Sequence, residues 1–247
     1  DVVQNEGTGF NWNVNFNATT FQRKIEDVDP FDRIELGGIA GGTGANILVN
    51  QTGFTPSSFY VYKQLYDNAG NPIEGAYADL DGNGIINSSD RYLYNNTDPD
   101  LLLGFASSMN YKNIDFSFNL RASFGNRVYN NVNSNRAVYA RLQPSGDNAA
   151  ANAPVSLLNT NFENTTNTLT SDLYVENASF LRMDNITLGY TFPKWLEGKA
   201  SVRLFTGIQN AFVLTDYSGL DPEITGGIDN TIYPRQRSFL FGANVKF

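Results

Sequence analysis

The most constraining feature of the chain is a stretch of strict alternation at residues 238–247, which read SFLFGANVKF. In a β-strand, successive side chains point to opposite faces. One face of this stretch therefore carries Phe239, Phe241, Ala243, Val245 and Phe247. The other face carries Leu240, Gly242, Asn244 and Lys246. A strand of this kind belongs to a sheet with one apolar face, in a soluble β-sandwich or in a membrane β-barrel, and on its own it does not separate the two.

Other stretches repeat the pattern at a length that favours the barrel. In Phe10–Thr19 (FNWNVNFNAT) one face carries Asn11, Asn13, Asn15 and Asn17, which is typical of a hydrated inner wall rather than of a soluble surface with varied charges. Ile114–Phe124 (IDFSFNLRASF) alternates over eleven residues, and a tilted strand needs roughly nine to eleven residues to cross a bilayer. Further strands are predicted at Leu101–Tyr111 and at residues 179–192 and 201–214.

Composition excludes several classes of function. The net charge of −8 and the pI near 4.5 argue against a nucleic-acid partner. Histidine and cysteine are both absent, which removes the commonest general base, thiolate metal sites and most nucleophilic triads. No run of 18 apolar residues exists, so the sequence predicts no membrane-spanning helix, whereas barrel strands give only short alternating segments. Because histidine and cysteine are absent, we expect no enzyme activity.

Loop lengths alternate along the predicted strands. Short turns are expected at residues 112–113 and 193–199, and long polar segments at about 67–99, 130–170 and 217–237. This alternation is typical of outer-membrane barrels, which have short periplasmic turns and long outer loops. Shorter strands are predicted at residues 33–36 and 58–66. The glycine-rich run at 37–44 lacks the lysine and spacing of a phosphate loop, so we interpret it as a flexible turn.

Residues 79–90 (DLDGNGIINSSD) have the spacing of a calcium loop. Asp79, Asp81, Asn83, Ile85 (through its carbonyl), Asn87 and Asp90 occupy positions 1, 3, 5, 7, 9 and 12, and Gly84 occupies the sharp-turn position 6. Hard oxygen ligands at this spacing let a short loop surround one Ca²⁺ ion, with aspartate replacing the usual glutamate at position 12, as in dockerin-type loops. The alternative is an Asx- and Gly-rich turn that binds nothing. We expect a structural Ca²⁺ site.

Other polar and aromatic residues are weaker candidates. Asp221 and Glu223 have the carboxylate chemistry of an acid–base pair, but Pro222 between them indicates a turn. The same holds for the carboxylates around Pro30. Four tyrosines in predicted outer loops are candidates for stacking on sugar rings or for loop packing: Tyr92, Tyr94, Tyr139 and Tyr217.

Five blocks of the sequence resemble SusC-like TonB-dependent transporters, in the order found at the C-terminal part of their barrels. They are residues 58–92, 110–130, 174–193 (YVENASFLRMDNITLGYTFP), 204–224 (LFTGIQNAFVLTDYSGLDPEI) and 233–247 (YPRQRSFLFGANVKF). The resemblance implies an all-β fold: residues 1–247 would form the C-terminal segment of a 22-stranded antiparallel transmembrane β-barrel. The signal peptide and plug domain of such proteins are not present in these residues, and residues 238–247 would be the seam strand.

The resemblance also implies a function. A protein of this family lies in the outer membrane of a Gram-negative bacterium and crosses it many times. It imports oligosaccharides or peptides, with a SusD-like surface lipoprotein as a lid and TonB as the source of energy. The alternative that the residues leave open is a secreted β-sandwich that acts as a glycan-binding or adhesive module with a dockerin-like calcium loop.

Overall fold

A computed structural model of the chain describes residues 2–5, 9–39, 45–142, 152–164, 170–195, 197–230 and 232–247. Most of the predicted glycine turn at 37–44 lies outside these residues. In the described part of the chain no helix is long and apolar enough to cross a membrane.

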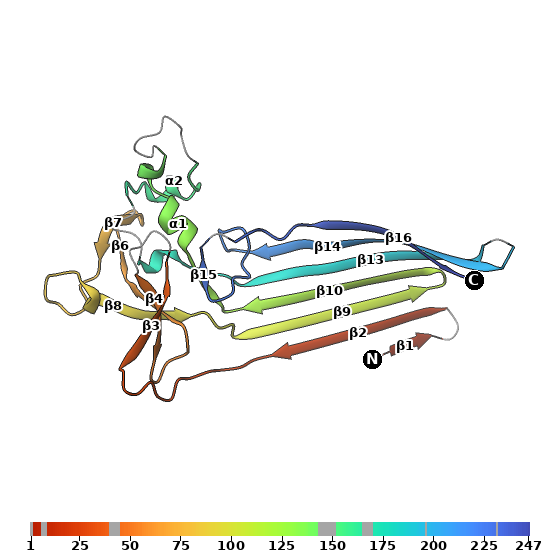
Figure 1. Cartoon of the computed structure of the whole chain (residues 1–247), viewed down its shortest axis with the longest axis horizontal. Coiled ribbons are helices and arrows are strands. Elements are labelled where there is room, and N and C mark those ends of the chain that lie inside the picture. Colours follow the sequence, from red (N-terminus) through yellow and green to blue (C-terminus); the bar gives the residue numbers. More distant parts are fainter. Residues whose placement is uncertain are drawn as a thin grey trace.

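One long antiparallel sheet organises the molecule (Figure 1). Its seven strands follow one another across the sheet in the order β1 (Val2–Asn5), β2 (Phe10–Thr19), β9 (Leu101–Tyr111), β10 (Ile114–Phe124), β13 (Phe180–Trp195), β14 (Ala200–Thr215) and β16 (Ser238–Lys246). The membrane-length strands predicted from alternation are therefore confirmed, and they are neighbours. The sheet is open, with β1 and β16 at its edges.

Short and long connections leave opposite ends of this sheet. The hairpins β9–β10 and β13–β14 lie at one end, together with the C-terminus, and the three long excursions lie at the other (Figure 1). The turn between β9 and β10 consists of two residues, because Tyr111 pairs with Ile114 and Lys112 has a φ of 52°. The predicted alternation of loop lengths is thus present in the structure.

The long excursions form an outer body beyond the end of the sheet. It contains a four-stranded sheet of β3 (Arg33–Gly38), β4 (Asn46–Gln51), β5 (Ser58–Tyr62) and β8 (Arg91–Asn96), and a hairpin of β6 (Gln64–Tyr66) and β7 (Pro72–Tyr77). A third sheet joins β12 (Val175–Asn177), β11 (Arg127–Asn130) and β15 (Ile228–Asp229). The helices are α1 (Asn131–Arg136) and α2 (Leu157–Thr160), with short 3₁₀ turns η1 (Ser88–Asp90), η2 (Tyr139–Arg141) and η3 (Asp172–Tyr174).

Two expectations differ from the structure, and the core of the outer body explains the first of them. Residues 58–66 form two short strands there, β5 and β6, and not one strand of the long sheet. Phe59 and Val61 are fully buried, and Tyr60 between them is 6% exposed, so both faces of β5 are covered. A lipid-facing strand would be apolar on one face only. The other difference is that β13 extends through Trp195, which shortens the turn predicted at 193–199.

The long sheet exposes its apolar face. Phe241 is 83% exposed and Phe239 is 63% exposed, and among the described residues no second sheet packs on this face. A β-sandwich buries that face against a partner sheet. The arrangement therefore disagrees with the sandwich alternative and matches a barrel wall that faces lipid.

Candidate functional site

The two faces of the long sheet differ in chemistry from edge to edge. Strand pairing places mostly apolar residues in rows on one face, for example Trp12, Met109, Phe116, Leu188 and Phe241, with Thr206 as the polar member of this row. The opposite face carries a row of Asn15, Ala106, Asn119, Asn185, Gln209 and Ser238. Amide side chains both donate and accept hydrogen bonds. The second face therefore suits contact with water and polar solutes.

Two polar side chains on the apolar face are paired within the protein. The Trp12 Nε1–H donates to the Ser107 hydroxyl at 3.0 Å, and the Thr206 hydroxyl donates to the Leu240 carbonyl at 3.2 Å. An unpaired polar group in hydrocarbon costs several kcal/mol of free energy. The hydrogen bonds of Trp12 and Thr206 avoid this cost. These contacts fit a face that meets lipid.

An ionic cluster joins the polar face to the segment between β14 and β16. Its members are three arginines and three acids: Arg121, Arg182, Arg235, Asp184, Asp221 and Glu223. Arg121 binds both oxygens of Glu223, at 2.6 and 2.9 Å, and its Nε lies 2.6 Å from Asp184. Arg235 Nη2 lies 3.1 Å from Glu223 Oε2. The fork of a guanidinium fits a carboxylate in this bidentate manner.

Irregular strand geometry brings the cluster together. The register between β10 and β13 shifts at Asn119/Leu120, which leaves Asp184 as the extra residue of a β-bulge. The bulge lets Asp184 reach Arg121 on the polar face. Opposite it, Asn210 in β14 has a φ of 50°, and its side-chain oxygen accepts a hydrogen bond from Arg182 Nη1 at 2.7 Å. Both strands therefore deviate from regular geometry where the ionic cluster forms.

A second ion pair crosses the polar face near the short-turn end. Arg203 in β14 donates from Nε to Asp115 Oδ1 in β10 at 2.8 Å, which bridges the intervening strand β13. The bridge passes over Gly189. A Cβ at that position would lie 2.5 Å from Asp115 Oδ1 and 2.6 Å from Arg203 Nη2. A side chain at Gly189 would therefore have to displace the ends of these two side chains.

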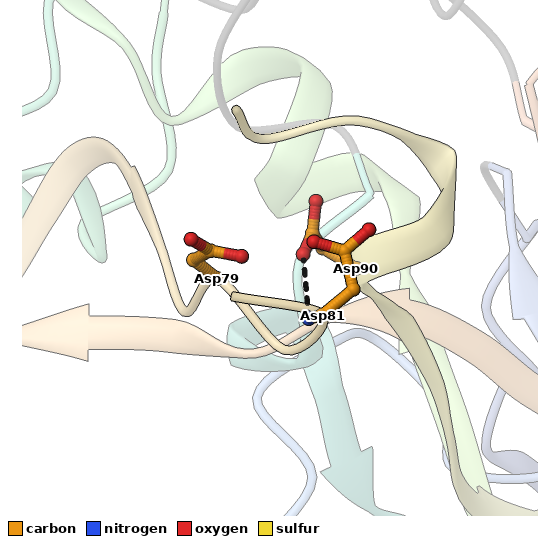
Figure 2. Close-up of side chains that lie close together, drawn as sticks. All are labelled: Asp79, Asp81 and Asp90. Carbon is orange, nitrogen blue, oxygen red and sulfur yellow. Dashed lines mark hydrogen bonds between the residues drawn. The ribbon is translucent and has the colours of Figure 1, made fainter. Parts of the chain in front are cut away.

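The predicted calcium loop lies in the outer body, between β7 and β8, and its three carboxylates converge (Figure 2). One carboxylate oxygen of each of Asp79, Asp81 and Asp90 lies within 4.8 Å of the others. Asp79 accepts from the backbone N–H groups of Gly82 and Gly84, each at 2.8 Å, which folds the loop around it. Positive φ angles at these two glycines, 74° and 79°, permit the tight turn.

Asp90 anchors the end of this loop. Its carboxylate is fully buried and accepts from the N–H groups of Asn87 and Leu80, each at 2.8 Å, and of Asp81 at 3.4 Å. These backbone donors, the Asn87 N–H first, hold the pKa of Asp90 below its usual value although burial opposes the shift. Asn87 in turn caps η1 by accepting from Ser89 N–H. Asp90 is therefore ionised and fixed in place.

The remaining predicted ligands take part in bonds within the loop. Asn83 Oδ1 accepts from the Ile85 N–H at 2.7 Å, and Asn87 Nδ2 donates to the Ile85 carbonyl at 3.1 Å. The structure thus brings Asp79, Asp81 and Asp90 together, and places Asn83, Ile85 and Asn87 in the turns between them. Asp90 Oδ1 accepts two N–H bonds and Asp90 Oδ2 accepts one, so Asp90 keeps a lone pair on Oδ2, and the oxygen donor set fits a Ca²⁺ ion.

The four tyrosines considered for sugar stacking have packing roles where their contacts are defined. Tyr217 is buried, and its hydroxyl donates to Asp229 at 2.8 Å; Tyr92 donates to Asp172 at 2.6 Å. Tyr139 donates to Asn161 at 3.1 Å, and Tyr94 packs against Tyr92. Asp221 and Glu223 are held in the ionic cluster, so they are not an acid–base pair. The sequence did not lead us to predict the ionic cluster. Arginine on the polar face of membrane-length strands was the feature of the sequence that could have indicated it.

Comparisons with known proteins identify relatives along almost the whole chain. No family model matches. TonB-dependent receptor SusC of Bacteroides thetaiotaomicron is 38% identical over 249 residues, which cover 96% of this chain and 24% of that protein. TonB-dependent receptor P3 of Formosa agariphila is 30% identical over 284 residues, covering 96% of this chain and 27% of that protein. The chain therefore spans about a quarter of the length of these curated relatives.

Solved structures show the same fold. The RagAB peptide importer in its closed-closed state matches with a TM-score of 0.72 and 16% identity, over 98% of this chain and 28% of the importer chain. Its open-open state also matches with a TM-score of 0.72, over 100% of this chain. At this identity the likeness concerns the fold, and it places the open seven-stranded sheet within a larger barrel wall.

Proposed function

The chain belongs to the SusC-like TonB-dependent receptors of the Gram-negative outer membrane, and on that premise we propose that it forms part of the wall of a nutrient importer. The transported solutes are oligosaccharides or peptides. A SusD-like lipoprotein closes the outer side, and TonB supplies energy through parts of the protein outside this chain. The names of the relatives support this proposal, since they include TonB-dependent receptors and a peptide importer.

One structural observation carries the proposal. The long sheet has an exposed apolar face and, on its other side, a face of amides and ion pairs. A wall between lipid and an aqueous lumen needs these two chemistries on opposite faces of each strand. The outer body stands at the end where the long connections lie (Figure 1), which is the end where outer loops of such barrels meet solute and partner.

Uptake by cells tests the transport proposal. Cells that produce the full-length receptor should accumulate fluorescent maltoheptaose or a labelled peptide mixture. Accumulation should fall to background when TonB or the co-expressed SusD-like lipoprotein is deleted. Uptake that continues without TonB would contradict the proposed energy source, and uptake of neither solute would contradict the substrate classes.

Cysteine labelling tests the wall itself, since the chain contains no cysteine. A fluorophore on Phe241→Cys should be quenched by lipids with brominated acyl chains. A fluorophore on Asn119→Cys, on the opposite face, should escape that quenching and respond to a water-soluble quencher. Equal lipid quenching at both positions would contradict the assignment of faces.

We also propose that the loop at 79–90 holds one structural Ca²⁺ ion. Three converging carboxylates and the EF-hand spacing support the proposal. The ion would join the two ends of the loop, because Asp79 and Asp81 lie at its start and Asp90 at its end. We assign the ion a structural role because the loop lies in the outer body, away from the long sheet (Figure 1).

A further inference from the structure

A cavity of about 500 Å³ lies where the two α-helices meet the segment that follows β14. Residues of α1, α2 and the 218–232 segment form its walls. Its volume falls within the range of about 300–1,000 Å³ that small-ligand sites occupy. Helix α1 lies beside β15, at the end of the long sheet where the outer body begins, and α2 lies beyond α1 (Figure 1).

Hydrogen bonds hold the walls in position. The Ser156 hydroxyl, next to α2, donates to Asn133 Oδ1 in α1 at 3.1 Å. Asn133 Nδ2 and Asn130 Nδ2 each lie 3.0 Å from the Ser218 hydroxyl oxygen. Glu176 then accepts from the Ser218 N–H at 2.9 Å. Three segments of the cavity wall are therefore tied to one another and to β12, and such preorganisation lowers the entropic cost of binding a ligand.

The accessible charge in this cavity is positive. Among the described residues, the charged side chains that line it are Arg136 and Asp229. Asp229 is 2% exposed and accepts a hydrogen bond from the Tyr217 hydroxyl. Arg136 is exposed, and within the described parts of the chain it forms no ion pair. A ligand that enters the cavity therefore meets an available guanidinium, which is suited to bidentate binding of a carboxylate.

The remaining lining is aliphatic, with amides at its edge. Val132, Pro154, Val155, Leu220 and Ile232 supply the apolar surface, and the described residues that line the cavity include no aromatic ring. Val155 is 79% exposed and Leu220 is 67% exposed, so both are available to an apolar group of a ligand. The exposed Asn159 also lines the cavity and adds an amide donor and acceptor. The lining therefore favours an aliphatic group over the face of a sugar ring.

We propose that this cavity binds the carboxylate end of a small ligand, with Arg136 holding the carboxylate and the aliphatic wall covering the group beside it. A peptide with a free C-terminus offers both parts. A uronic acid at the end of an oligosaccharide offers the same carboxylate. The inference rests on the proposed transport function and adds to it a site and a ligand chemistry.

Equilibrium binding to the full-length receptor in detergent tests the proposal with four probes. They are the tetrapeptide Gly-Gly-Ala-Leu with a free carboxylate, the same peptide as its C-terminal amide, trigalacturonic acid and maltotriose. The free-acid peptide should bind at least about tenfold more tightly than its amide, because one charge-assisted hydrogen-bonded contact is lost in the amide. Maltotriose should not bind with an affinity that depends on Arg136.

Variants locate the effect. Arg136→Gln should reduce the affinity for the free-acid peptide at least about tenfold and leave the amide unchanged. Arg136→Lys, which keeps the charge but not the fork, should retain part of the affinity. Arg141→Gln is the matched control, since this nearby exposed arginine already donates to Asn135 at 2.7 Å. Unchanged melting temperatures should show that the exposed substitutions leave the fold intact.

Each outcome decides the proposal. Binding of trigalacturonic acid with the same dependence on Arg136 supports the site and assigns the carboxylate to a sugar. Absence of binding by both carboxylate probes, equal affinity for acid and amide, or wild-type affinity in Arg136→Gln overturns it. Arg136-dependent binding without TonB-dependent uptake contradicts the transport proposal alone, whereas normal uptake with binding independent of Arg136 contradicts this inference alone.

Discussion

Arg182 Nη2 in β13 lies 2.6 Å from Asp221 Oδ1 in the segment between β14 and β16, and both residues are buried, at 1% and 3% exposure. The pair joins β13, a strand of the barrel wall, to the outer segment that follows β14. Arg182 Nε has no hydrogen-bond partner but lies 3.5 Å from Glu223 Oε2, so the guanidinium faces two carboxylates. The outer segment is therefore fastened to the polar face by a buried ionic contact.

Replacing one member of this pair should release the outer segment. Arg182→Met leaves the buried Asp221 carboxylate with the Glu223 N–H at 2.9 Å and the more distant Arg235 guanidinium at 3.7 Å. Breaking a buried ion pair by removing one partner costs about 3–5 kcal/mol. We expect a lower melting temperature for the full-length receptor and faster proteolysis within residues 217–237. Arg237→Met, a change at an exposed arginine close by, should affect neither measurement, and an Arg182→Met variant as resistant as wild type would contradict a fastening role.

A side chain at Gly189 should disturb the Asp115–Arg203 ion pair, whereas one at Gly207 on the neighbouring strand should fit. An added Cβ at Gly189 meets the Asp115–Arg203 ion pair at 2.5–2.6 Å, while at Gly207 the nearest atom is 3.5 Å away. Gly189→Ala should therefore reduce stability by up to about 1 kcal/mol, because it displaces a partly exposed ion pair. Gly207→Ala should leave stability unchanged or raise it slightly, since glycine weakens a strand interior. Thermal unfolding of both variants in the same detergent gives the comparison.

Local patterns predicted the strands because the period of two is visible within each one. Ile114–Phe124 could be assigned, faces included, from its own eleven residues. The position of β5 could not, because its burial depends on residues such as Ile47 and Tyr129, which lie in other segments. Aromatic residues on both faces of 58–66 were the local sign that this stretch differs from the lipid-facing strands.

The two groups of charged residues also differ in whether their contacts are local in the sequence. Asp79, Asp81 and Asp90 lie within twelve residues, so their spacing predicted that they converge. The Arg121–Glu223 contact joins residues 102 positions apart and requires the bulge at Asp184. No local pattern encodes which strands become neighbours or where the register shifts, and the cavity beside Arg136 depends on both.

Calcium should stabilise the loop at 79–90 through the converged carboxylates. Titration of the full-length receptor with Ca²⁺ should show a site with an affinity near that of extracellular calcium modules, about 10⁻⁴–10⁻³ M. Asp81→Ala removes a carboxylate that faces Asp79 and Asp90, and should abolish the corresponding heat signal. Asp32→Ala, a change at an exposed carboxylate outside the loop, is the control. An identical titration for wild type and Asp81→Ala would leave the loop as a turn only.

Acid should loosen this loop through Asp90. Backbone N–H donors, that of Asn87 first, hold its pKa below the usual value, so the folded loop favours the ionised form. The stabilisation is complete above the pKa of the unfolded chain, about 4, and is lost as the pH falls through the lower folded pKa. Protection of the Leu80 and Asn87 amides from hydrogen exchange, corrected for intrinsic rates and measured without Ca²⁺, should fall in that window. Asp90→Asn should show low protection at every pH.

Two adjacent residues of β16 should respond in opposite ways to a positive charge. Phe241 lies on the apolar face and is 83% exposed, whereas Leu240 points to the polar face. An arginine on the lipid face of a barrel strand costs about 2–4 kcal/mol near the bilayer midplane, while one facing the lumen meets water. Phe241→Arg should therefore lower the yield of receptor folded into lipid vesicles, and Leu240→Arg should fold as wild type does. Both variants introduce the same side chain, arginine, into the same strand. A lower folded yield for Leu240→Arg than for Phe241→Arg would therefore mean that the two faces of the sheet are assigned the wrong way round.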